Sequence, residues 1–257
     1  MADASPRRVR VTIVGNSTAY TVKPSRESRV DAPFGELLPA FLGDVDVDVR
    51  CHARWFGMVD QAADGYETLI RSTQPDVVIV NYGINECMPR FLPNRLTSHL
   101  LDWNRPRGAV RDAYRSRVLP RVWPTLRTYQ RVAADRAGLI TWRMSPARFE
   151  RELHRLVSAV RDELQSLVLV MGITPPSGDI LWLLPHLDAR RDVHQAVIER
   201  VVASWPRGVR LIDTASVVSE LGDDAVPDGI HFSAKAHTRV AEVIAAEIER
   251  WMNASDR

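Results

Sequence analysis

Short apolar segments recur along this chain, and each is separated from the next by a stretch long enough to form a helix. Four of them are rich in valine, isoleucine and leucine: Val9–Val14, Val77–Asn81, Leu167–Gly172 and Val209–Ile212. Apolar strands without polar alternation are buried on both faces, as in parallel sheets covered by helices. The pattern therefore predicts an α/β protein with helices on both faces of a parallel sheet.

A fifth strand is predicted at Val45–Cys51, where valine and aspartate alternate as they do in a strand with one wet face, at the edge of a sheet. The segments between the strands have helical character. Helices are predicted at Phe34–Leu42, Gln61–Gln74, Ala189–Trp205 and Ala234–Trp251. In a sheet of this kind ligands bind beyond the carboxyl ends of the strands, so polar residues that follow strands are the candidates for chemistry.

The chain of 257 residues is long enough for one large domain, which we expect to span residues 1–257. Its two cysteines are too few for a disulfide framework, and no apolar run approaches the roughly 18 residues that span a bilayer. The N-terminal residues lack the apolar stretch of a signal peptide. We therefore expect a cytoplasmic protein without a membrane span. The histidines show no metal-ligand spacing, and we expect neither a metal nor a cofactor.

Residues 87–146 form a longer connection than a single crossover helix needs. Fifteen arginines and five acidic residues lie between Arg90 and Arg155, although the net charge of the whole chain is only +2. Helical pieces are predicted at Ala109–Leu119 and Pro124–Ala137. We interpret the segment as a lid-like insertion that attracts an anionic substrate or carrier. Solvated helix faces whose aromatic residues pack on the core explain it equally well, and no motif indicates nucleic-acid binding.

Three short polar segments stand at strand ends or near the start of a helix: Gly15-Asn16-Ser17, Gly83-Ile84-Asn85-Glu86 and Asp228-Gly229-Ile230-His231. Together they supply the residues for acyl transfer through a serine. Ser17 would be the nucleophile and His231 its base, with Asp228 on the same side of a helical turn orienting the imidazole. Taken singly, each segment has a structural explanation as a helix cap or a turn.

The combination of these segments resembles the SGNH/GDSL-type hydrolases. Gly15-Asn16-Ser17 stands in the place of the family's Gly-Asp-Ser block, and Gly57 in Trp55-Phe56-Gly57 in the place of the second-block glycine. The other two segments resemble the Gly-x-Asn-Asp and Asp-x-x-His blocks. The resemblance implies a flavodoxin-like three-layer fold with five parallel strands. It also implies an oxyanion hole formed by the backbone N–H groups of Ser17 and Gly57 and the amide of Asn85.

The sequence departs from the family pattern at two positions. Asn16 replaces the usual aspartate beside the nucleophile, and Glu86 replaces the aspartate after the oxyanion asparagine. Neither position belongs to the triad, so we expect activity to be retained. We expect a serine esterase or deacylase that acts on a short acyl ester of a polar, anionic or carrier-bound small molecule. An acyltransferase with the same triad, or a binding protein without turnover, are the alternatives.

Overall fold

The computed structural model describes residues 8–24, 32–90, 136–137, 140–184 and 186–255. A central sheet contains five strands in the order β2-β1-β3-β6-β7, and every neighbouring pair is parallel. The strands are β1 (Arg8–Gly15), β2 (Asp46–Ala53), β3 (Val77–Asn81), β6 (Leu167–Met171) and β7 (Val209–Ile212). The predicted parallel α/β sheet is confirmed, and the strand with alternating valine and aspartate lies at its edge.

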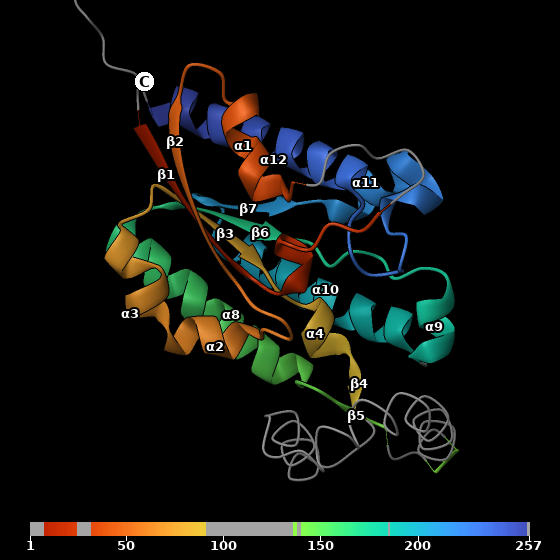
Figure 1. Ribbon diagram of the computed structural model, residues 1–257. Coiled ribbons are helices and arrows are strands. Elements are labelled where there is room, and N and C mark those ends of the chain that lie inside the picture. The colour runs from red at the N-terminus through yellow and green to blue at the C-terminus, as the bar shows by residue number, and fades with distance from the viewer. Residues whose placement is uncertain (1–7, 25–31, 91–135, 138–139, 185, 256–257) are drawn as a thin grey trace, which may run out of the picture.

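Helices cover both faces of the sheet (Figure 1). One layer contains α1 (Phe34–Phe41), α11 (Thr214–Leu221) and α12 (Ala234–Ser255). The opposite layer contains α2 (Val59–Asp64), α3 (Tyr66–Leu69), α8 (Pro146–Ala159) and α10 (Leu187–Ala203). Sheet and helices therefore make three layers, α/β/α.

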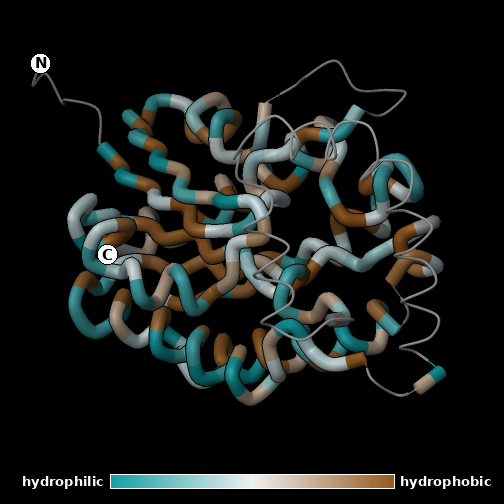
Figure 2. Tube along the Cα trace, turned by 60° about the horizontal axis from the view of Figure 1, so that its bottom comes forward, coloured by the Kyte–Doolittle hydropathy of each residue, from teal (hydrophilic) through white to brown (hydrophobic). Residues whose placement is uncertain are grey.

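Alternate residues of the buried strands pack into two separate hydrophobic cores, one on each face of the sheet. In β3, Val78 and Val80 pack with the side chains of α2, α8 and α10, whereas Val77 and Ile79 pack with those of α1 and α12. All four side chains are inaccessible to solvent. Hydrophobic residues accordingly gather along the central strands and the inner sides of the helices (Figure 2). This double burial explains why the strands lack polar alternation.

The remaining short elements connect this framework. They are 3₁₀ turns at Ser17–Ala19, Arg71–Thr73 and Gly222–Ala225, a π-helical turn at Val160–Leu164, α4 (Ile84–Cys87), α9 (Asp179–Leu183), and an antiparallel pair of β4 (Pro89–Arg90) with β5 (Thr141–Trp142). None of the described helices combines the length and the apolar character that crossing a membrane would require.

The continuous helix predicted at 61–74 is wrong. Gly65 ends α2, α3 follows it directly, and a separate 3₁₀ turn leads to Gln74, which has a left-handed backbone. Glycine disfavours a helix interior. The hydroxyls of Ser72 and Thr73 also donate to the carbonyls of Thr68 and Ile70, which favours a turn over a regular helix.

Most of the predicted insertion at 87–146 lies outside the described residues, including the helical piece predicted at 109–119 and all but the last two residues of the one predicted at 124–137. Its two described ends lie side by side, because β4 follows α4 and pairs with β5 just before α8 begins. The two described ends of the segment therefore meet at one place, next to α4. The interpretation of this segment as a lid stays a prediction.

His237, on α12, ties three segments together from a fully buried position. Its Nδ1 accepts a hydrogen bond from the backbone N–H of Phe34 (3.1 Å), and its Nε2 lies 3.1 Å from the carbonyl oxygen of Thr21. The imidazole is therefore neutral, with its proton on Nε2. Burial is the main cause that lowers the pKa of His237 from 6.5 to about 4.

This lowered pKa predicts a loss of stability in acid. Between pH 6.5 and 4 the unfolded chain binds a proton at His237 that the folded chain does not bind, so the free energy of unfolding falls as the pH falls. A shift of this size corresponds to about 3 kcal/mol across that window. Urea unfolding at pH 7 and pH 4.5 is expected to show a smaller pH dependence in His237→Gln than in the wild type, and equal dependence would contradict the assignment.

Candidate active site

Ser17 follows the carboxyl end of β1 as the first residue of a 3₁₀ turn. The residue that caps this turn is Asn16, whose side-chain oxygen accepts hydrogen bonds from the backbone N–H (3.0 Å) and the hydroxyl (2.7 Å) of Thr18. Asn81, at the end of β3, donates to the same hydroxyl. The capping function that serine often has is thus provided by its neighbour, and the Ser17 hydroxyl is left for another partner.

That partner is His231. The Ser17 Oγ lies 2.8 Å from His231 Nε2, and His231 Nδ1 lies 2.8 Å from Asp228 Oδ2. The carboxylate can only accept, so Nδ1 carries the ring proton and Nε2 is the acceptor for the Ser17 hydroxyl. The structure therefore brings together the three residues that the sequence singled out, as a continuous hydrogen-bonded chain.

The turn that carries Asp228 and His231 differs from the predicted helical one. Asp228 Oδ1 accepts hydrogen bonds from the backbone N–H groups of Ile230 (3.1 Å) and His231 (2.7 Å), which makes an Asx turn. Gly229 has a φ of +79°, and a Cβ there would clash with the Ser177 carbonyl oxygen. The close spacing of acid and histidine thus depends on a glycine turn and on the carboxylate itself.

Asp228 stays ionised in this environment. Burial acts to raise its pKa, but the hydrogen bonds from the ring and the backbone of His231 outweigh burial and hold the pKa of Asp228 well below its usual range. Lys23 Nζ also lies 3.4 Å from Asp228 Oδ2, the oxygen that faces the imidazole. The carboxylate therefore has two cationic partners when His231 takes up a proton.

Of the three predicted oxyanion donors, Ser17 lies in the turn after β1, and Gly57 and Asn85 follow β2 and β3. Asn85, on α4, is buried and its side-chain N–H donates to the Gly57 carbonyl oxygen (2.9 Å). The Gly57 N–H donates to the Arg54 carbonyl oxygen (3.0 Å), so its oxyanion role requires that this hydrogen bond be shared or released. A Cβ at Gly57 would lie 3.0 Å from the Gly15 carbonyl oxygen, which explains the need for glycine.

Aromatic side chains beside the histidine are a feature of the site that the sequence alone did not single out. The Trp55 ring lies edge-on to His231, with 5.9 Å between centroids, and Tyr20 lies edge-on to Trp55 at 6.3 Å. Trp55 and Phe56 are more than half exposed, and the Arg143 guanidinium lies 4.9 Å from the Phe56 ring centroid. The position of Trp55 and Phe56 directly after a strand is the feature of the sequence that could have indicated a place in the site, but only the fold brings that loop to His231.

Other candidates have structural explanations. Cys87 is buried, its thiol donates to the Ile84 carbonyl oxygen, and burial raises its pKa strongly, which disfavours the reactive thiolate. Asp213 accepts a hydrogen bond from the Ser216 N–H and caps α11. His194 is buried, with its two ring nitrogens near the carbonyl oxygens of Arg190 and Met144.

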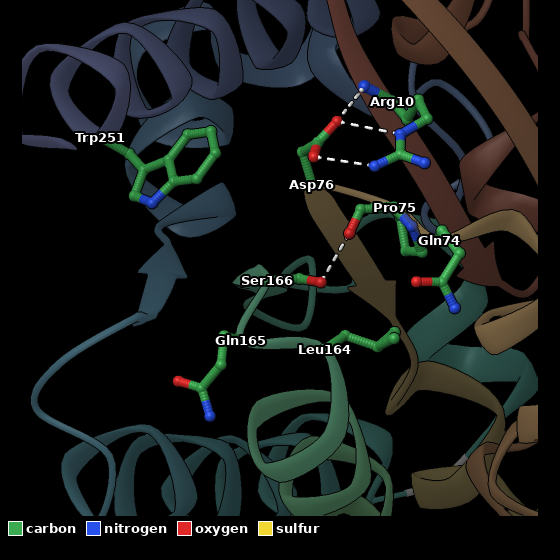
Figure 3. Close-up of a pocket in the computed structure, with 8 residues that line it drawn as sticks. All are labelled: Arg10, Gln74, Pro75, Asp76, Leu164, Gln165, Ser166 and Trp251. Atoms are coloured by element: carbon green, nitrogen blue, oxygen red, sulfur yellow. Dashed lines mark hydrogen bonds and ion pairs between the residues drawn. The ribbon is translucent and has the colours of Figure 1, made fainter. Parts of the chain in front are cut away.

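A surface hollow lies at the opposite end of the sheet, where β3 and β6 begin (Figure 3). Its lining includes Arg10 and Asp76, which form an ion pair (3.2 Å), together with Ser166 and Trp251. Arg10 also uses its backbone N–H to bind the Asp76 carboxylate. This hollow is at the amino ends of its strands, away from the edge where Ser17 and Asn85 lie.

Residues 13–239 match the model of the GDSL-like lipase/acylhydrolase family. The match includes Ser17, Gly57, Asn85, Asp228 and His231. Comparison with curated proteins found no match.

Solved structures with this fold align along nearly the whole chain. A lipase/acylhydrolase from Enterococcus faecalis has a TM-score of 0.61 at 14% identity, covering 94% of this chain and 95% of its own. Axe2, an acetylxylan esterase from Geobacillus stearothermophilus, has a TM-score of 0.60 at 13% identity, with 95% of both chains covered. LAE5, an α/β hydrolase from the metagenome of Lake Arreo, Spain, has a TM-score of 0.59 at 15% identity, with 94% and 95% covered. At these identities the likeness shows the three-layer fold alone.

Proposed function

Because the chain belongs to the GDSL-like lipase/acylhydrolase family, and is thus a serine hydrolase, we propose that it removes a short acyl group from a polar small molecule through an acyl-enzyme. The observation that carries the proposal is the unbroken hydrogen-bonded chain from Ser17 through His231 to Asp228, with 2.8 Å at each step. A free serine hydroxyl is a poor nucleophile at neutral pH, and this chain supplies the base that it needs.

The reaction then follows from the geometry. Ser17 Oγ attacks the ester carbonyl carbon as its proton passes to His231 Nε2, and Asp228 stabilises the imidazolium that forms. The carbonyl oxygen becomes an oxyanion that the Ser17 N–H and Asn85 would stabilise, with Gly57 if its N–H is released from Arg54. Collapse expels the alcohol, which takes the proton from Nε2. Water, deprotonated by His231, then releases the acid and restores the Ser17 hydroxyl.

Several features support a small, polar or anionic substrate. Arg143 places a positive charge beside Phe56, on the loop next to His231, and the sequence around it is rich in arginine. Axe2, which shares the fold, is an acetylxylan esterase. We therefore propose an acetyl or similarly short acyl group on a polar carrier molecule.

Acyl transfer is the second candidate, favoured by one observation. Trp55 and Phe56 expose apolar surface beside His231, and such a surface can hold an acceptor alcohol in place of water. The acyl-enzyme would then pass its acyl group to the acceptor hydroxyl, whose proton moves to His231 Nε2. The two candidates share every step up to the acyl-enzyme.

The test is hydrolysis of p-nitrophenyl acetate, butyrate and octanoate by purified protein. Turnover that declines with chain length is the expected result and would support the short-acyl proposal. Faster release of p-nitrophenol on adding glycerol or xylose, with acylated product and less free acid, would favour transfer. Absence of turnover, together with failure of a fluorophosphonate to label Ser17, would contradict both and favour a binding protein.

A further inference from the structure

Glu86 stands directly beside Asn85 but has no part in the proton transfers described above. Its side chain is completely buried, although no arginine or lysine pairs with it among the described contacts. Burying a carboxylate is costly unless hydrogen bonds compensate for its lost hydration. A buried acid in this place therefore calls for an explanation.

The two carboxylate oxygens accept hydrogen bonds from two different loops. Oε1 accepts from the backbone N–H of Val59 (2.7 Å), the first residue of α2 and two residues beyond Gly57. Oε2 accepts from the backbone N–H of Gly83 (2.8 Å), which precedes α4. One side chain thus joins the loop after β2 to the loop after β3.

Asn85 makes a second bridge between the same loops, because its side-chain N–H donates to the Gly57 carbonyl oxygen. Two consecutive residues of the short helix α4 therefore hold the Gly57–Val59 segment: Asn85 donates a hydrogen bond to it, and Glu86 accepts one from it. These are the loops that carry two of the proposed oxyanion donors. Their relative position decides the distance of those donors from the substrate oxygen, and errors of an ångström are costly in catalysis.

We propose that Glu86 is a positioning residue, which in its ionised form holds the loops of Gly57 and Asn85 in the arrangement that stabilises the oxyanion. The inference rests on the proposed function. It also explains the departure from the family pattern, because the side chain of an aspartate is one methylene shorter and would not span the same two N–H groups from this backbone position.

The charge of Glu86 is finely balanced. Burial is the largest influence and raises its pKa from 4.5 to about 7, while the N–H groups of Val59 and Gly83 act to lower it. The titratable groups around it are Asp60 on α2, Tyr82 after β3 and Cys87 on α4. On α10, the positive charges of Arg190 and Arg191 act to lower the pKa of Cys87. Protonation would turn one acceptor oxygen into a hydroxyl and weaken the link to one of the two loops.

The test compares Glu86→Gln and Glu86→Asp with the wild type. We expect Glu86→Gln to lower kcat for p-nitrophenyl acetate at least tenfold with little change in KM, because its amide N–H₂ opposes one of the two backbone donors. In the wild type, protonation of Glu86 is expected to add a fall in kcat as the pH drops through about 7, so log kcat should decline more steeply toward acid than in Glu86→Gln. Glu152→Gln, at a buried carboxylate of α8 paired with Arg151 and Arg155, is the matched control and should keep the wild-type profile.

Amide hydrogen exchange provides a readout that needs no turnover. The backbone N–H groups of Val59 and Gly83 are expected to exchange faster in Glu86→Gln and Glu86→Asp than in the wild type, while those of the central strand β3 are unchanged. Unchanged exchange at both positions, or a wild-type kcat and pH profile in Glu86→Gln, would overturn the proposal. If the wild type neither turns over nor reacts with a fluorophosphonate, the proposed function fails, whereas the exchange measurement still decides whether Glu86 joins the loops.

Discussion

Replacing Ser17 with alanine is expected to abolish ester hydrolysis while leaving the fold intact. The substitution removes the atom that forms the acyl-enzyme, and the loss for a nucleophilic serine is on the order of a million-fold in kcat. Ser17 is buried, and among the described residues its side chain makes one hydrogen bond, to His231, so the free energy of unfolding should fall by about 1 kcal/mol or less. Initial rates with p-nitrophenyl acetate and a thermal unfolding curve measure the two effects.

A matched control is available on α8, where the hydroxyl of Ser158 lies 3.1 Å from His154 Nδ1. Ser158→Ala removes a serine that contacts a histidine outside the site, and it should keep full activity and full labelling by a fluorophosphonate. Retention of activity in Ser17→Ala would show that another group performs the reaction.

Asp228→Asn is expected to lower kcat by about ten-thousand-fold, the size of loss seen when a triad aspartate becomes an amide. The amide N–H₂ can donate to His231 Nδ1 and so favours the ring form that carries its proton on Nε2. In that form Nε2 cannot accept a hydrogen bond from the Ser17 hydroxyl. The amide also removes the negative charge that would stabilise the imidazolium. The side-chain oxygen can still accept from the N–H groups of Ile230 and His231, so the turn is expected to persist.

The corresponding control is Asp213→Asn. Asp213 also accepts a hydrogen bond from a backbone N–H three residues ahead, at Ser216, but it caps α11, and its described hydrogen bonds reach Ser216 rather than a triad residue. Near-wild-type kcat is expected there. An Asp228→Asn enzyme that retains more than a tenth of the wild-type kcat would show that the carboxylate does not orient His231 as proposed.

The strands could be predicted from the sequence because burial on both faces leaves a simple signature. Val77–Asn81 and Val209–Ile212 have the bounds that the apolar runs predicted, and β2 reveals its edge position through its aspartates. The helical pattern of 61–74 was misleading because periodicity reports which face is apolar and is insensitive to Gly65, where the helix ends. Local backbone preferences decide such breaks, and a single glycine can outweigh the pattern.

The sequence was sufficient to predict which residues form the triad of the candidate site, but not how they contact one another. The sequence predicts that a helical turn brings Asp228 and His231 together, whereas in the structure an Asx turn with a left-handed Gly229 does so. Lys23 was not singled out, because only the fold places its ammonium 3.4 Å from the Asp228 carboxylate. Trp55 and Glu86 likewise owe their roles to neighbours that lie far away in the sequence.

The contact between Ser17 and His231 joins residues that are 214 positions apart. Ser17 follows β1 and His231 precedes α12, so the contact cannot form until these two elements have been brought together. Loops of this length close late, since their entropy is lost before the contacts at their ends are gained. The catalytic hydrogen bond therefore serves as a marker of completed folding. The rate at which Ser17 becomes reactive toward a fluorophosphonate during refolding should follow the slowest structural phase.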